Sequence, residues 1–206
     1  MLLEAKDISY RYEKKKNILN KISLQIEEGE KVGLIGPSGC GKSTLAKILA
    51  GYLLPEGGGV LLDEKPLPQK GYCPVQLIYQ HPEKALNPQK KLKYSLCEGF
   101  SPSAELLKSM AIKSEWLNRW PNELSGGELQ RFCIARILGE KTRFLIADEI
   151  STMLDAVSQA QIWKYLLGIV ERRSMGMLVI THNKALAYKI CDRVIDFKDI
   201  KSAIKT

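Results

Sequence analysis

The chain has 206 residues, of which 45% are hydrophobic and 26% charged, and a formal net charge of +8. This length suits one domain with an inserted subdomain, and the composition is that of an ordinary globular protein, which excludes the disordered and fibrous classes. The sequence has nothing that resembles a signal peptide and no apolar run near the roughly 18 residues of a membrane-spanning helix. We therefore expect the protein to stay in the compartment where it is made.

The positions of the cysteines and lysines indicate the redox compartment of the protein and the kind of partner it binds. The five cysteines, Cys40, Cys73, Cys97, Cys133 and Cys191, are odd in number and form no C-x-x-C pair, so we expect reduced thiols in a cytosolic protein. Cys40 precedes a predicted helix, which lowers a thiol pKa and favours oxidation, but a small filler in the loop is the simpler interpretation. The basic runs Lys14–Lys16 and Lys90–Lys91 are short and separated, which is typical of solvated turns, and we expect no nucleic-acid partner.

The first 80 residues predict an antiparallel layer followed by the first strands of a parallel sheet. Alternation of apolar and polar residues predicts half-buried strands over Leu2–Tyr12 and Ile18–Ile26. After these, the expected elements are a strand over Val32–Ile35, a helix over Thr44–Ala50, a flexible turn over Pro55–Gly59, and strands over Val60–Lys65 and Val75–Gln80.

Residues 81–124 have a different character. They contain no strand pattern, prolines punctuate them, and helices are expected near Lys91–Glu98 and Ala104–Ala111. From residue 125 the α/β rhythm returns, with a helix over Leu129–Leu138, a strand over Phe144–Ala147, a helix over Ala156–Leu167 and a strand over Met177–Ile180. The pattern predicts one domain of the α/β class. Its core, 1–80 and 125–206, has a mainly parallel sheet and an N-terminal antiparallel β-subdomain, and 81–124 is an inserted helical subdomain.

The sequence GPSGCGKST lies between a predicted strand and a predicted helix and matches G-x-x-x-x-G-K-[ST], the phosphate-binding loop of P-loop NTPases. Its glycines let successive N–H groups point into one concavity at a helix N-terminus. Lys42 is expected to bind the β- and γ-phosphates of a nucleotide, and Ser43 to complete the ligands of Mg²⁺. The expected nucleotide contacts are Gly36, Pro37, Ser38, Gly39, Cys40, Gly41, Lys42, Ser43 and Thr44. A glycine-rich turn that happens to carry a lysine is the alternative.

Polar residues also follow two other predicted strands. Asp148 and Glu149 end the strand at Phe144–Ala147, so one carboxylate is placed to hold Mg²⁺ and the other to face an attacking water. His182 ends the strand at Met177–Ile180, where a neutral imidazole is suited to a γ-phosphate. A surface acidic pair and a structural histidine are the alternatives, and His81 keeps the structural interpretation.

A second helix start has the features of an anion site. Ser125, Gly126, Gly127 and Glu128 directly precede the predicted helix at Leu129–Leu138, and small residues there free N–H groups at the helix N-terminus. Ser125 lies three residues before Glu128, the spacing of a capping box, so an N-cap is the other interpretation. The two are compatible.

Taken in order, these motifs resemble those of ATP-binding cassette (ABC) ATPases: GPSGCGKST, Gln80 after its strand, LSGGELQR at 124–131, FLIADE with Leu154-Asp155, and Thr181-His182. The resemblance runs from about residue 3 to about residue 198. The run from Tyr79 to Lys91 and the segment SQAQIW at 158–163 are most similar to the oligopeptide, dipeptide and nickel import ATPases.

The resemblance implies ATP and Mg²⁺ as ligands and gives each residue a role. Tyr12 would stack on adenine, where a flat ring suits a nucleobase. Gln80 would contact Mg²⁺ and water, and Asp148 would be the second metal-shell carboxylate. Glu149 would be the general base, and His182 the switch residue at the γ-phosphate.

The resemblance also implies a head-to-tail dimer in which Ser125, Gly126, Gly127 and Glu128 complete the ATP site of the other subunit, while Asp155 communicates across the interface. The resemblance leaves open whether the dimer consists of two copies of this chain or of two different cassettes. The implied partners are transmembrane permease subunits and, indirectly, a solute-binding protein, with the chain peripheral on the cytoplasmic face of the cell membrane. The implied function is ATP hydrolysis that drives import of peptides, nickel or a metal complex.

Three other functions are to be compared with that of an importer ATPase. A soluble cassette acting in translation, DNA repair or iron–sulfur assembly is the first. A non-hydrolysing half of a heterodimer is the second, but it predicts loss of Glu149, His182 or the LSGG stretch, which are all present. A P-loop GTPase is the third, but the run from Asn183 to Leu186 lacks the aspartate that pairs with a guanine edge.

Overall fold

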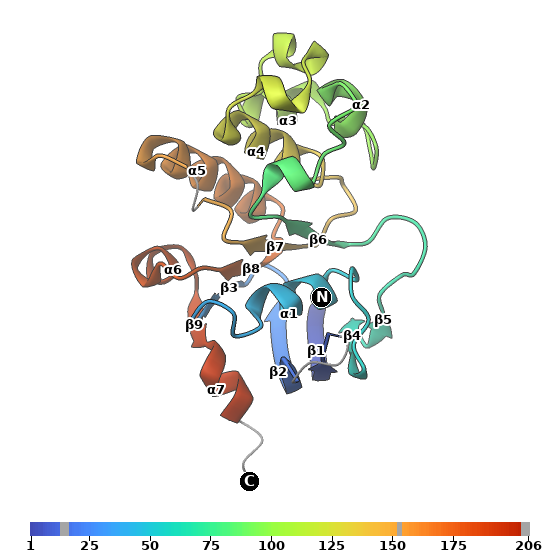
Figure 1. The fold of residues 1–206 in the computed structure, drawn as a ribbon, viewed down its shortest axis with the longest axis vertical. Helices are drawn as coiled ribbons and strands as arrows, with labels where there is room; N and C mark the ends of the chain where they lie inside the picture. Colours follow the sequence, from blue (N-terminus) through green and yellow to red (C-terminus); the bar gives the residue numbers. More distant parts are fainter. Residues whose placement is uncertain (13–16, 152–153, 203–206) are drawn as a thin grey trace. The chain divides into compact units, whose positions relative to one another are not determined.

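The computed structural model describes residues 1–12, 17–151 and 154–202 (Figure 1). The predicted turn at Lys14–Lys16 lies outside the described residues. The chain splits into two compact units, one made of Met1–Leu77, Arg143–Asp148 and the residues from Ser174 onward, the other of Ile78–Thr142 and Glu149–Arg173. The predicted subdomain boundaries, with 81–124 as an insertion, stay a prediction. No helix among the described residues is long and apolar enough to cross a bilayer.

The first unit contains a four-stranded sheet in the order β2-β1-β4-β5, with β1 antiparallel to β2 and β4. Its strands are β1 (Leu2–Tyr10), β2 (Leu19–Glu27), β4 (Gly57–Leu62) and β5 (Lys65–Pro66). Apolar residues alternate along β2, which buries Ile22, Leu24 and Ile26. The antiparallel β-layer predicted for the N-terminal part is confirmed.

One expectation in this sheet was wrong. Gly57–Gly59, predicted as part of a flexible turn, opens strand β4. A Cβ on Gly58 would lie 2.1 Å from the carbonyl oxygen of Lys6, and Gly58 has a φ of 76°. Gly58 is required because β4 pairs with β1 too closely there for a side chain, at an irregular register, and not because the chain turns.

The second sheet of this unit has the order β6-β7-β8-β3-β9. Its strands are β3 (Lys31–Ile35), β6 (Val75–Ile78), β7 (Phe144–Asp148), β8 (Gly176–Ile180) and β9 (Arg193–Asp196). Strand β3 runs parallel to β8 and β9, and β7 runs parallel to β8. Strands β7 and β8 are buried along their whole length, as expected for strands covered on both faces. The predicted α/β class with a parallel sheet is confirmed.

Three helices complete the first unit: α1 (Lys42–Leu49), α6 (Lys184–Ile190) and α7 (Phe197–Ser202). Helix α6 packs against β3, and α1 packs against β7. The sequence patterns did not predict β9, α6 or α7, because these elements are too short to show a clear periodicity.

The second unit is helical, with α2 (Leu92–Leu96), α3 (Ala104–Ser109), α4 (Gly126–Ala135) and α5 (Ala156–Arg172), and with short 3₁₀ turns η1 (Pro82–Lys84), η2 (Ser114–Asn118) and η3 (Pro121–Glu123). Helices α2 and α3 are present where helices were predicted, but shorter. Helix α4 begins three residues earlier than predicted, because Ser125 caps its N-terminus.

The core of this unit lies on α4, which buries Leu129, Phe132 and Ile134. The ring of Phe132 lies 6.3 Å from that of Trp116 in η2. The guanidinium of Arg173, just past α5, donates to the carbonyls of Leu138, Gly139, Glu140 and Thr142. These bonds satisfy the backbone beyond α4 and fasten it to α5.

Candidate functional site

The register of the parallel sheet brings three predicted site segments to one edge. Asp148 is opposite Ile180, and Ile180 is opposite Leu34. The phosphate-binding loop begins two residues after Leu34, and His182 follows two residues after Ile180. All of these positions lie at the carboxyl ends of parallel strands, where α/β proteins bind their ligands.

Packing behind the loop fixes the conformation of its glycines. Gly41, the N-cap of α1, has a φ of 116°, and a Cβ there would lie 2.9 Å from Cδ2 of Leu19. Gly36 meets Phe197, whose Cβ would be 3.0 Å from an added Cβ. The loop is therefore pressed between β2 and the start of α7 at positions that only glycine fits.

The side chain of Lys42 folds back over the loop that precedes this residue. Its side chain is buried, at 5% exposed, and its Nζ donates to the carbonyl oxygens of Gly36 (2.8 Å) and Pro37 (2.9 Å). The Sγ of Cys40 lies 3.8 Å from the same nitrogen. The ammonium is thus held where the loop curves around the N-terminus of α1, where both the cation and the helix dipole favour an anion.

The residues predicted to hold Mg²⁺ offer the right donor atoms. Ser43 is exposed in the first turn of α1, and Asp148 is buried, at 8% exposed, at the end of β7. Mg²⁺ takes oxygen ligands and keeps several waters, so it needs only one or two protein oxygens beside substrate phosphates. No group of three or more His, Cys, Asp or Glu side chains that would hold a metal occurs among the described residues. A hydroxyl and one carboxylate therefore fit a nucleotide-bound Mg²⁺ and do not fit an all-protein metal cage.

His182 is exposed between two ordered neighbours. Buried Thr181 accepts a hydrogen bond from the Asn183 N–H through its hydroxyl (3.0 Å). Asn183 in turn caps α6 by accepting from the N–H of Leu186 (3.1 Å). These bonds fix the backbone on both sides of His182 while its ring faces solvent, as a ligand-binding imidazole requires.

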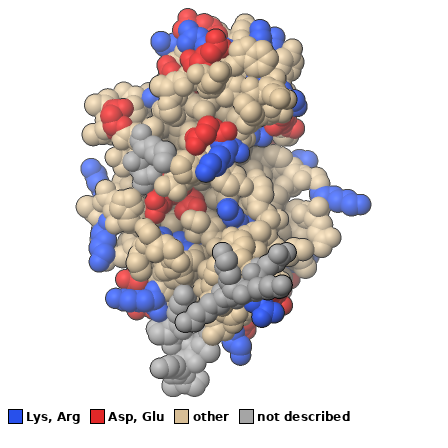
Figure 2. All heavy atoms as spheres, in the orientation of Figure 1, with Lys and Arg blue, Asp and Glu red and all other residues tan. Residues whose placement is uncertain are grey.

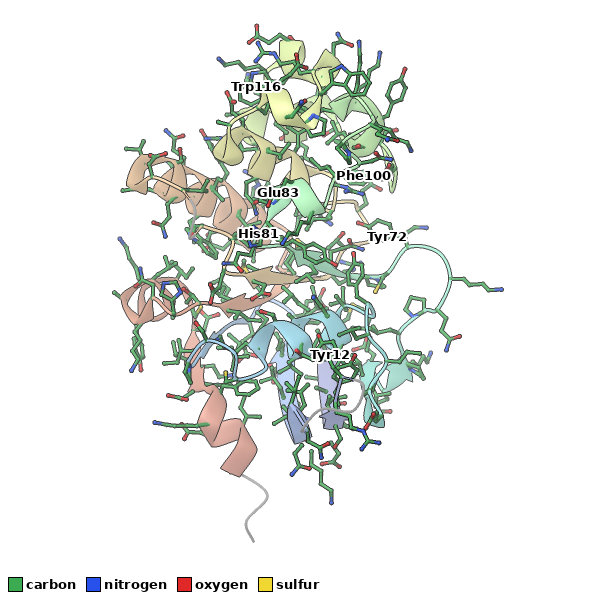
Figure 3. All side chains as sticks on the ribbon, viewed as in Figure 1. Tyr12, Tyr72, His81, Glu83, Phe100 and Trp116 are labelled. Carbon is green, nitrogen blue, oxygen red and sulfur yellow. The ribbon has the colours of Figure 1, made fainter. Side chains whose placement is uncertain are left out.

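Tyr12 follows β1 and is 38% exposed (Figure 3). Its ring stands edge-to-face against Tyr10, with centroids 5.1 Å apart and planes at 88°. This contact restrains the Tyr12 ring, which stays partly exposed to solvent.

In the second unit the structure brings together two predicted catalytic residues. The Nε2 of Gln80 donates to Oε2 of Glu149 across 3.3 Å, and both side chains are half-buried. The backbone of Glu149 is left-handed, with a φ of 50°. A non-glycine residue in that region is uncommon and concentrates at functional sites, so the position of Glu149 is determined by its surroundings at a cost in backbone energy.

The predicted second anion site forms a closed capping box. The Ser125 hydroxyl accepts from the N–H of Glu128 (3.3 Å), and the Glu128 carboxylate accepts from the N–H of Ser125 (2.9 Å). The hydrogen bond from this N–H lowers the pKa of Glu128 below its ordinary value. The N-cap interpretation is confirmed, while the anion-site role of Ser125–Glu128 stays a prediction. Gly126 is exposed, and nothing lies within 4 Å of a Cβ added there.

Asp155 caps the next helix of this unit. Its Oδ1 accepts from the N–H groups of Val157 and Ser158, at 3.0 Å each. Hydrogen bonds from Ser158, first from its side chain and then from its backbone, lower the pKa of Asp155. The side chain is exposed at the N-terminus of α5, and its predicted role between subunits stays a prediction.

The structure also describes the surroundings of His81, the state of the cysteines and the distribution of basic side chains. His81 lies beside Glu83, with Nδ1 and Oε1 3.0 Å apart, in agreement with a structural histidine (Figure 3). All five cysteines are free thiols, as expected. On the face in Figure 2, basic side chains are scattered among acidic and uncharged ones and do not gather in one field.

Sequence reasoning missed Phe197. Its side chain is 1% exposed, and it lies against the Cβ positions of both Gly36 and Gly41. It thus supports the phosphate-binding loop from behind. The apolar run Val194-Ile195 before it was the available signal, but its four-residue strand is too short to stand out.

Comparisons with known proteins agree with this geometry. A protein-family profile described as "ABC transporter" matches residues 19–152. The nickel import ATP-binding protein NikE of Escherichia coli O6:K15:H31 is 32% identical over 221 residues, covering 94% of this chain and 82% of that protein. The nickel import system ATP-binding protein NikE of Staphylococcus aureus strain bovine RF122 is 32% identical over 211 residues, covering 96% and 87%. A dimeric ATP-binding cassette, solved in a post-hydrolysis state with ADP and Pi, has a TM-score of 0.79 at 25% identity, covering 94% of this chain and 93% of that one.

Proposed function

The chain belongs to the ABC transporter family, and from this premise we propose that it is the ATP-hydrolysing subunit of an importer. One observation carries the proposal. The buried ammonium of Lys42 lies in a glycine loop at the N-terminus of α1, on the sheet edge that also ends in Asp148 and His182. This arrangement concentrates phosphate-binding groups where the family places its nucleotide.

ATP binding uses the first unit. The N–H groups of the loop, from Ser38 to Thr44, bind the β- and γ-phosphates, and Lys42 exchanges the carbonyls of Gly36 and Pro37 for phosphate oxygens. Tyr12 stacks on the adenine. Ser43 and Asp148 would hold Mg²⁺, which would supply positive charge that neutralises the phosphates.

Hydrolysis is assigned to Glu149, Gln80 and His182. Glu149 takes a proton from the attacking water, and Gln80, already bonded to Glu149, orients that water. His182 donates a hydrogen bond to the γ-phosphate and stabilises the charge that develops there. The proton taken up by Glu149 leaves with the products.

We propose that a second cassette completes the site. The residues at the start of α4, Ser125–Glu128, of which Ser125 and Gly126 are exposed, contact the γ-phosphate of ATP bound to the opposite subunit, and Asp155 contacts the opposite subunit beside them. Dimeric structures among the similar cassettes support this arrangement. Closure on ATP and reopening after hydrolysis are then the mechanical output.

The permeases and the cargo are proposed from the relatives. Nickel import proteins of two bacteria match nearly the whole chain, which supports import of nickel, a nickel complex or another small solute such as a peptide. The cassette would dock on the cytoplasmic side of two permease subunits and depend indirectly on a solute-binding protein. The Gln80–Pro88 region would pass closure to the permeases. The soluble roles in translation, DNA repair or iron–sulfur assembly are not favoured by these relatives.

Two measurements test the proposal. The purified chain should hydrolyse ATP in the presence of Mg²⁺, and Lys42→Met should abolish this activity. When expressed with its permeases, the chain should co-purify with them and support ATP-dependent uptake of radioactive nickel into vesicles. Co-purification with ribosomes or DNA in place of a membrane protein would replace the importer by the soluble alternative.

A further inference from the structure

Helix α4 is fastened to the segment after β6 by three regularly spaced hydrogen bonds. The Nε2 of Gln130 donates to the carbonyl of Tyr79 (3.3 Å), and the Sγ of Cys133 donates to the carbonyl of Pro82 (3.5 Å). The guanidinium of Arg136 donates to the carbonyl of Ala85. Donors and acceptors both advance by three residues, so the donors lie on one face of the α4 segment. We call these three hydrogen bonds the ladder, and each bond a rung.

The first two rungs are buried. Gln130 is 1% exposed and Cys133 is 3% exposed. Burial raises the pKa of Cys133 to about 12, so its thiol keeps the proton that it donates. Removal of a buried donor leaves its carbonyl partner without a hydrogen bond, so the loss of either bond costs considerable free energy.

The third rung belongs to a surface network. Arg136 also donates to Oε2 of Glu98 (2.8 Å), and Lys90 reaches the other oxygen of that carboxylate at 3.4 Å. The far end of the 79–85 segment is therefore held by a planar guanidinium that is itself oriented by an ion pair.

The ladder connects two features of the proposed mechanism inside one unit. Tyr79, the first acceptor, directly precedes Gln80, whose amide contacts Glu149. Ser125, at the other end, starts the same helix that carries the donors. A displacement of α4 thus acts on the backbone next to Gln80.

We propose that Gln130 is a positioning residue for ATP hydrolysis. With Cys133 and Arg136 it fixes the 79–85 segment to α4 and so holds the Gln80 amide against Glu149. This inference rests on the proposed function, because it concerns the efficiency of that reaction. Gln130 touches neither ATP nor water and acts through Gln80.

The test is a double-mutant cycle on the purified ATPase. Gln130→Met keeps the volume and removes the donor, and kcat should fall about tenfold, the worth of one buried hydrogen bond, while KM for ATP changes less than about twofold. In a Gln80→Ala background the same change should lower kcat no further, because the residue through which it acts is gone.

Two further variants keep the result interpretable. Arg136→Met removes the most exposed rung, is less disruptive to folding, and should lower kcat about threefold with the same loss of effect in the Gln80→Ala background. Thr142→Val removes another buried side-chain bond of the same unit, from Thr142 Oγ1 to the carbonyl of Ile137 (2.6 Å), and should leave kcat per folded molecule unchanged.

Equal falls of kcat in both backgrounds, or no fall in either, would overturn the role of Gln130 and leave the ATPase proposal standing. An inactive wild-type protein would instead overturn the proposed function, and the inference with it.

Discussion

The amide of Gln80 and the carboxylate of Glu149 are hydrogen-bonded, with Nε2 and Oε2 3.3 Å apart. The two residues are 69 positions apart in sequence, and each follows a different buried strand. Glu149 reaches this contact with a left-handed backbone, at a φ of 50°. Such strain persists only where the surroundings hold it in place, as expected for a base and its orienting amide at an active site.

Lys42→Met should weaken ATP binding by about 10–100-fold, because it removes a charge-assisted hydrogen bond to phosphate. Titration with a fluorescent ATP analogue measures the change. Lys47→Met, on the same helix and near its end, is the matched control and should bind like the wild type. Undiminished affinity of the Lys42 variant would mean that the loop does not bind the phosphates.

Tyr12→Ala should weaken ATP binding by about 1–3 kcal/mol, the usual worth of one aromatic stack on a base. Binding of inorganic tripolyphosphate, which has no base, should not change. Tyr94→Ala in α2 removes another exposed tyrosine, 58% exposed, and is the control. Equal ATP affinity of the Tyr12 variant would point to Tyr10 or to no stack.

Gly176→Ala should destabilise the fold by about 3 kcal/mol, because overpacking of a rigid site is costly. Its Cβ would lie 2.3 Å from Cε1 of Phe144 and 2.8 Å from the carbonyl oxygen of Glu27. Gly59→Ala, in β4 with nothing within 4 Å of the added Cβ, should be neutral or slightly stabilising. Urea unfolding of both variants checks the difference, and similar midpoints would contradict the packing described for β8.

Glu128→Gln should reduce stability at neutral pH and much less in acid. The pKa of Glu128 is lowered from 4.5 by the Ser125 N–H, so the ionised carboxylate stabilises the fold above that value. This contribution is lost as pH falls through the folded-state pKa, where wild type and variant converge. Urea unfolding from about pH 7 to about pH 3.5 tests the trend. Glu105→Gln in α3 should follow the wild type throughout, and a pH-independent deficit of the Glu128 variant would contradict the charge effect.

Much of the site could be predicted because its signals are local. The glycine spacing of 36–41, the apolar strand before Asp148 and the three-residue spacing of Ser125 and Glu128 each encode a backbone shape or a helix start. The structure has the loop, the strand and the capping box at these positions. Local patterns also predicted the alternation of strands and helices.

What could not be predicted depends on contacts distant in sequence. The glycines of β4 predicted a turn, because no local pattern in 57–59 indicates that Gly58 lies close to the carbonyl oxygen of Lys6. Phe197 was not singled out, since its role comes from contact with the loop. The ladder from Gln130 to Tyr79 joins residues 51 apart, and no pattern along the chain reveals such a pairing.

The central claim, that this chain hydrolyses ATP with Glu149 as base, is tested most directly by the turnover of Glu149→Gln. We expect the variant to bind ATP with wild-type affinity, to form a stable dimer in its presence, and to lose hydrolysis by about 10²–10⁴-fold, the usual contribution of a general base. Glu105→Gln, an exposed carboxylate of the second unit, should hydrolyse ATP at the wild-type rate. A Glu149→Gln variant that turns over ATP as fast as the wild type would contradict the account.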